Sequence, residues 1–144
     1  MIRFFLASIL LVAATVCPEQ KYHDYTKSPA VVDPNRIALD PASGQRLCLG
    51  QVIATQGRSW TVAGAVCDPD GDRMTLTASV GELQRWDDGA YKVTGPADAL
   101  GVLYVTLTCT DEPPDATQAL TRAGTWIVIV VPPNRAPVLC GGLP

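Results

Sequence analysis

Short apolar segments separated by turn-forming residues dominate this chain from residue 51 to residue 131. Seven segments of five to eight residues are rich in β-branched and aromatic side chains: 51–55, 60–67, 74–80, 82–86, 90–94, 104–110 and 125–131. Such segments favour strands and are too short for most helices. Gly, Pro and Asp lie between them, as in Asp68-Pro69-Asp70-Gly71-Asp72. The spacing predicts an all-β chain folded as an antiparallel β-sandwich of about seven strands.

The N-terminus has the pattern of an export signal or a short anchor. Residues 1–17 carry one charge, Arg3, ahead of an apolar run that is shorter than the ~20 residues of a membrane-spanning helix. The small residues Val12-Ala13-Ala14 favour cleavage by a signal peptidase after Ala14. Retention as an anchor and lipidation at Cys17 are the two alternatives. Each alternative places the protein outside the cytoplasm: periplasmic, on the cell surface or extracellular.

The remaining chain divides by composition. Residues 18–46 are polar and rich in Pro, Asp and Lys, which predicts an extended arm or linker. Residues 47–140 form the predicted sandwich, and residues 141–144 are a tail. The sequence VVDPNR at 31–36 returns as VVPPNR at 130–135, five of six positions agreeing. This repeated sequence marks the beginning and the end of one module.

Five cysteines fit an exported protein better than a metal or redox enzyme, because no pair has CxxC spacing. Four cysteines can pair in three ways. We favour Cys67–Cys109, since each residue closes a predicted strand just before an Asp-containing turn, together with Cys48–Cys140. Cys17 is then left over, as a free thiol, an acylation site or a bridge to another chain.

Charge and motif content argue against several functions. Eleven Lys and Arg against fourteen Asp and Glu give a net charge of −3, which does not suit a nucleic-acid binder. The single histidine, His23, lies in the polar arm, and there is no GxSxG or Gly-rich phosphate loop. We therefore predict no catalytic residues. A small extracellular hydrolase is an alternative hypothesis, although these motifs do not support it.

A cluster of carboxylates offers the strongest candidate for metal chemistry. Asp68, Asp70 and Asp72 lie within five residues, and Asp111 follows a strand that could end nearby. Carboxylate oxygens are ligands that Ca²⁺ prefers, although the spacing differs from that of an EF-hand. The alternative is a tight turn, in which Pro69 fixes φ and Gly71 supplies a positive φ.

Two aromatic residues next to a turn form the candidate ligand-binding site. Trp86 and Tyr91 flank Asp87-Asp88-Gly89 and could present a platform to a sugar or a peptide. The alternative is that one or both rings fill the core. Trp60 and Trp126 lie inside predicted strands and are assigned to the core or the sheet surface.

A family resemblance combines these motifs. The DPDGD turn after an early strand, the segment YVTLTCTD and the exit PPNRAP resemble bacterial immunoglobulin-like and cadherin-like extracellular repeats over about ninety residues. That resemblance implies an immunoglobulin-like sandwich, without catalysis, that acts as a spacer, adhesive unit or accessory subunit. This chain departs from the family's usual pattern in two ways: it holds one module instead of a tandem array, and it carries four cysteines where such modules commonly have none.

We therefore expect a non-enzymatic interaction module that binds a protein partner in an envelope or extracellular assembly. Residues 1–17 would provide a membrane tether if they are retained. The alternative function is a carbohydrate-binding module that uses Trp86 and Tyr91, with Ca²⁺ at the aspartates.

Overall fold

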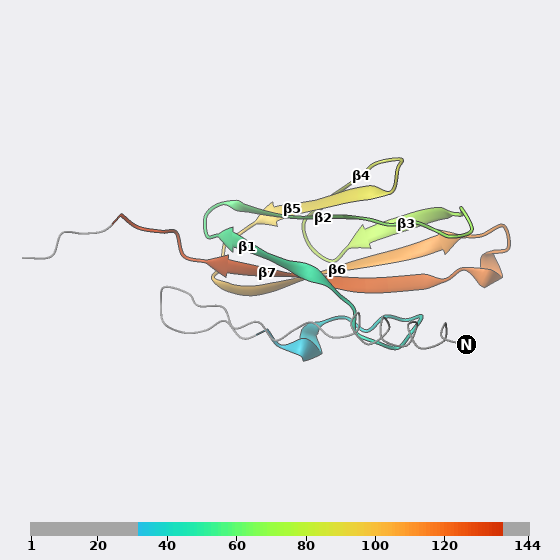
Figure 1. The fold of residues 1–144 in the computed structure, drawn as a ribbon, viewed down its shortest axis with the longest axis horizontal. Helices are drawn as coiled ribbons and strands as arrows, with labels where there is room; N and C mark the ends of the chain where they lie inside the picture. The colour runs from blue at the N-terminus through green and yellow to red at the C-terminus, as the bar shows by residue number, and fades with distance from the viewer. Residues whose placement is uncertain (1–31, 137–144) are drawn as a thin grey trace, which may run out of the picture.

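The computed structural model describes residues 32–136, and within them all seven predicted segments form strands (Figure 1). The strands are β1 (Cys48–Thr55), β2 (Ser59–Ala65), β3 (Arg73–Ala78), β4 (Glu82–Arg85), β5 (Ala90–Pro96), β6 (Gly101–Glu112) and β7 (Thr121–Val131). Two single 3-10 turns accompany them, η1 (Pro34–Arg36) and η2 (Ala116–Gln118). The last two strands are longer than predicted. β6 pairs with β7 from Gly101 onward and with β3 as far as Glu112, and β7 pairs with β6 from Thr121 onward.

The strands form two sheets, which confirms the predicted β-sandwich. One sheet has the order β1-β7-β6-β3 and the other β2-β5-β4. All pairs are antiparallel except β1 and β7, which run parallel. Figure 1 shows the two sheets as stacked layers.

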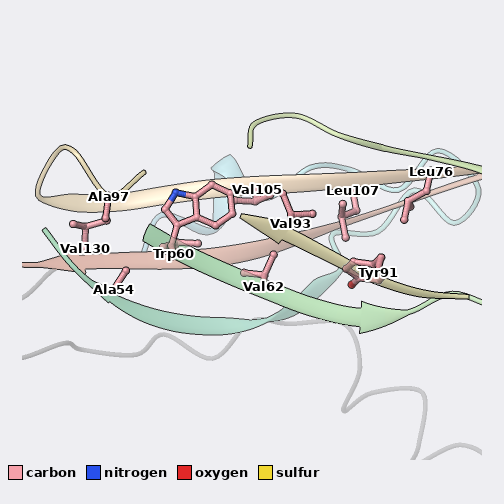
Figure 2. Close-up of a cluster of buried hydrophobic side chains, with 11 residues drawn as sticks. Ala54, Trp60, Val62, Leu76, Tyr91, Val93, Ala97, Val105, Leu107 and Val130 are labelled. Carbon is pink, nitrogen blue, oxygen red and sulfur yellow. The ribbon is translucent and has the colours of Figure 1, made fainter. Parts of the chain in front are cut away.

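The core between the sheets is built from every second residue of the strands, the residues that face inward. Trp60 and Val62 of β2 are buried, while Thr61 and Ala63 between them are exposed. Figure 2 shows Ala97 and Val130 at one end of this cluster, Tyr91 and Leu76 toward the other, and Trp60 between them. The Trp60 indole Nε1 donates to the carbonyl of Pro96 at 3.0 Å, so its polar atom is paired.

A second apolar layer lies on the outer face of the four-stranded sheet. Ile127, Ile129 and Val131 of β7 are buried there against Val32 and Ile37 of the N-terminal arm. The arm runs beneath β1 and β7 in Figure 1. Because β7 is covered on both faces, it lacks the apolar–polar alternation of a strand with one solvated face.

Polar contacts fix the described part of the arm to the sheet. The Tyr104 hydroxyl accepts from the backbone N–H of Asp33 at 2.8 Å and donates to its carbonyl at 3.0 Å. The Arg36 guanidinium lies 5.0 Å from the centre of the Tyr104 ring. Residues 32–46, expected as an extended arm or linker, are thus part of the packed structure.

Asp40 anchors the loop of the arm to the start of β7. Its buried carboxylate accepts from the Ala123 N–H at 3.0 Å and the Ser43 hydroxyl at 2.5 Å, and it pairs with Arg122 at 3.1 Å. Burial alone would raise the pKa of Asp40. The hydrogen bonds from Ser43, Ala123 and Ala42, together with Arg122, lower the pKa below 3.8.

Several predictions concern residues beyond this range. The signal or anchor at 1–17, Cys17, His23, Cys140 and the tail at 141–144 all lie outside the described residues. Between residues 32 and 136, no helix has the length and apolar character needed to cross a membrane.

Candidate functional site

One end of the sandwich is hollowed and densely charged. A cavity of about 520 Å³ lies between the β2–β3 loop, the end of β6 and the start of β7. A second hollow of about 340 Å³ shares Val66, Cys67, Asp68 and Met74 with it and extends to the β4–β5 turn. We call this region the acidic end, because six aspartates and three arginines line the two hollows: Asp68, Asp70, Asp72, Asp87, Asp88 and Asp111 with Arg73, Arg85 and Arg122.

The β2–β3 connection is the tight turn that its sequence predicts. The Gly71 N–H donates to the Asp68 carbonyl at 3.2 Å, and the Asp70 N–H donates to Asp68 Oδ1 at 2.7 Å. Gly71 has a φ of 79°, a conformation that glycine adopts without strain. The turn therefore holds the Asp68 side chain in place from within its own loop.

Three of the four predicted metal-binding aspartates come together. Asp68, Asp72 and Asp111 each place a carboxylate oxygen within 4.8 Å of the others, whereas Asp70 is exposed and outside this group. Pairing of β3 with β6 sets Met74 opposite Asp111 and so brings the start of β3 to the end of β6. These three carboxylates could supply three of the six to eight oxygens that Ca²⁺ takes.

The charges in this cluster repel one another. Loss of hydration, followed by the negative charges of Asp68, Asp70 and Asp111, raises the pKa of Asp72 above 3.8. The three arginines are engaged elsewhere: Arg73 faces Glu112 at 4.0 Å, Arg122 binds Asp40, and Arg85 donates to the Met74 carbonyl. The cluster therefore suits a cationic group from outside the chain.

Asp111 also has a structural role. Its Oδ1 accepts from the Leu120 N–H at 2.5 Å, and its own N–H donates to the Leu120 carbonyl at 3.1 Å. These bonds close the connection between β6 and β7 and leave the Leu120 side chain 66% exposed at the rim of the cavity. No sequence pattern distinguished Leu120, because its exposure depends on this closure.

The predicted bridge between Cys67 and Cys109 is absent, and both residues are free thiols. Cys67 is exposed on the loop after β2, while Cys109 lies in β6 of the opposite sheet, and both line the larger cavity. Bridged cysteines have Cα atoms about 4.4–6.8 Å apart, so a bridge would need the β2–β3 loop to close toward β6. Burial raises the pKa of the Cys109 thiol, Asp111 and Asp68 add to the rise, and Arg85 opposes it.

The other predicted bridge joins Cys48 to Cys140. Cys48 lies in β1 and is not among the free thiols of residues 32–136. Its predicted partner, Cys140, lies outside the described range, so the Cys48–Cys140 pairing stays a prediction.

The predicted aromatic platform is not formed. Tyr91 is 5% exposed and packs in the core, where its hydroxyl accepts from Trp126 Nε1 at 3.0 Å. Trp86, 45% exposed, remains at the surface beside the β4–β5 turn. The alternation of β5 directs Tyr91, Val93 and Gly95 inward, so Tyr91 cannot join Trp86 in holding a sugar. Trp60 and Trp126 belong to the core or its border, as predicted.

No protein-family model matches the chain, and no curated protein matches it significantly in sequence. Function is therefore inferred from the chemistry of the acidic end. Residues 32–136 contain no histidine, and the larger cavity is lined by carboxylates, thiols, apolar side chains and Arg122. This arrangement can bind a cation or a basic group and can undergo thiol chemistry.

Proposed function

We propose that the protein is an exported, non-enzymatic interaction module that binds a protein partner of an envelope or extracellular assembly through its acidic end. The observation that carries the proposal is the clustering of Asp68, Asp72 and Asp111 within 4.8 Å beside a cavity at one end of the sandwich. Loops held by a rigid scaffold are the usual positions of binding residues.

The partner that fits this surface carries basic residues. Six aspartates outnumber three arginines around the two hollows, and those arginines have partners within the fold. Exposed Leu120 adds apolar area at the rim of the larger cavity, and exposed Trp86 directly precedes Asp87 of the smaller hollow. A surface of mixed apolar and acidic character favours association with a complementary basic surface.

Strand order supports an immunoglobulin-like type for this module. Immunoglobulin domains place their second, fifth and fourth strands in one sheet and their seventh, sixth and third in the other. The same groups occur here as β2-β5-β4 and β7-β6-β3, while β1 pairs with β7 instead of β2. Modules of this type commonly act in recognition outside the cytoplasm, which agrees with the apolar sequence at 1–17.

Calcium is a second ligand to test at the same carboxylates. We expect Ca²⁺, titrated into the full chain by calorimetry, to bind with a signal that Asp72→Asn weakens and Asp98→Asn leaves unchanged. Asp98 is an exposed aspartate at the opposite end of the sandwich. Equal heats of Ca²⁺ binding for the wild type, Asp72→Asn and Asp98→Asn would assign the cluster to protein binding alone. We do not propose the carbohydrate-binding alternative, because Tyr91 is buried.

The protein partner is tested by site-specific photo-cross-linking in the cells that produce the chain. A photoreactive residue replaces Leu120 or Trp86 at the acidic end, and Leu100 at the opposite end is the matched exposed control. We expect one defined adduct from position 120 or 86 and none from position 100. The adduct should be lost when Asp68, Asp72 and Asp111 are replaced by Asn. Adducts of equal yield from Leu100, or adducts that survive the triple substitution, would contradict the proposal.

A further inference from the structure

We propose that Cys67 and Cys109 are a redox modification site, at which the two thiols exchange with a small-molecule disulfide and close a reversible bridge across the cavity that both line. In the structure both cysteines carry free thiols, one exposed and one partly buried. The inference concerns the thiols alone and does not depend on which partner the acidic end binds.

The distance between the two segments is short at this point of the fold. Asp68 follows Cys67 directly, and Asp111 is two residues beyond Cys109, on the same face of β6. Carboxylate oxygens of Asp68 and Asp111 lie within 4.8 Å of each other. The segments that carry the thiols therefore already approach each other to side-chain contact distance.

The two cysteines differ in secondary structure and in solvent access. Cys109 is fixed within its sheet, because β6 pairs at this position with Leu76 of β3 and Arg122 of β7. Cys67 is exposed and stands on the loop between β2 and β3, outside both strands. The closure that a bridge needs is a movement of this loop toward β6, into the cavity.

The exchange proceeds in two balanced steps. The Cys67 thiolate, the more accessible of the two, attacks a disulfide RSSR; a Cys67–SR bond forms, the S–S bond of RSSR breaks, and RS⁻ leaves. Cys109, on losing its proton, then attacks Cys67 Sγ and expels a second RS⁻. Two protein thiols are oxidised, one RSSR is reduced, and the two thiol protons end on two RSH.

A bridge would also act on the neighbouring carboxylates. It would tie the loop that carries Asp68 to the strand that carries Asp111, and so hold the two charges together. Oxidation and reduction would thereby change the geometry of the acidic end.

The test uses oxidised glutathione and peptide mapping of the folded full chain. Trypsin separates all five cysteines into different peptides, with Cys67 in residues 59–73 and Cys109 in residues 93–122. After incubation and alkylation, we expect these two peptides to be cross-linked in the wild type and released by dithiothreitol. Cys109→Ser should retain a stable glutathione adduct on Cys67, and Cys67→Ser should leave Cys109 as a thiol.

Three outcomes would overturn the proposal. The first is a stable glutathione adduct on wild-type Cys67 without any cross-link. The second is a cross-link from Cys67 to a cysteine other than Cys109. The third is modification of Cys109 in the Cys67→Ser protein as fast as in the wild type. Circular dichroism of both serine variants verifies folding, and Cys67→Ser, at an exposed loop position, keeps the test valid if Cys109→Ser does not fold.

Discussion

The hydroxyl of Tyr91 accepts a hydrogen bond from the indole Nε1 of Trp126 at 3.0 Å, and this bond joins the two sheets inside the sandwich. Tyr91 lies in β5 and Trp126 in β7. Gly64 makes room for the phenol, because a Cβ at that position would lie 2.6 Å from the hydroxyl oxygen.

Tyr91→Phe should lower the free energy of unfolding by about 1–3 kcal/mol, because it leaves the half-buried indole N–H without an acceptor. Chemical denaturation at neutral pH measures the loss. In a Trp126→Phe background the same change should cost less, since no donor is then left unpaired. Equal losses in both backgrounds would show that packing, not the hydrogen bond, is responsible.

Ile37→Ala should destabilise the whole protein by about 2–5 kcal/mol, because Ile37 is 2% exposed and packs against β7. Leu39→Ala is the matched control: Leu39 is 56% exposed, and its loss should change stability by no more than about 0.5 kcal/mol. Thermal unfolding of both variants compares them. Similar midpoints for the two would mean that the arm does not contribute to the folded core.

Asp40→Ala should cost about 1–3 kcal/mol at neutral pH, since it leaves the Ala123 N–H unpaired in a buried position. Arg122→Ala should cost no more than about 1 kcal/mol, because that side chain is largely solvent-exposed and the other donors to Asp40 remain. Denaturant unfolding of the three proteins under one buffer condition gives both values.

The contribution of Asp40 should also depend on pH. Its pKa in the folded protein is lower than the usual 3.8, so the carboxylate is favoured by folding. The stabilisation is complete well above 3.8 and is lost as the pH falls below 3.8 through the lowered pKa. The stability difference between wild type and Asp40→Ala should shrink across that acidic range; a difference that stayed constant would assign the effect to packing alone.

Asp72→Asn should raise the unfolding midpoint at low ionic strength, because it removes repulsion with Asp68 and Asp111. The gain should decrease as salt is added, since these groups are partly exposed and salt screens their interaction. Differential scanning calorimetry across a salt series measures both effects, and Asp98→Asn is the control. A lower midpoint for Asp72→Asn would contradict the repulsion inferred here.

Local features of the sequence determined the strands and the main turn. Alternation within a strand and the turn chemistry of Asp68-Pro69-Asp70-Gly71 depend on neighbouring residues only, so all seven strands and the turn were predictable. The meeting of Asp111 with Asp68 and Asp72 was also anticipated, because each lies at the end of a strand next to a turn.

Only the tertiary structure decided which face each strand buries and what covers it. Tyr91 and Trp86 are both aromatic residues near one turn, but the register of β5 buries Tyr91, whereas Trp86 follows β4 and is exposed. Cys67 and Cys109 line one cavity because the β2–β3 loop folds over the end of β6, and Asp40 is buried because the arm folds back on β7. Such outcomes depend on the packing of segments distant in sequence, which local patterns do not encode.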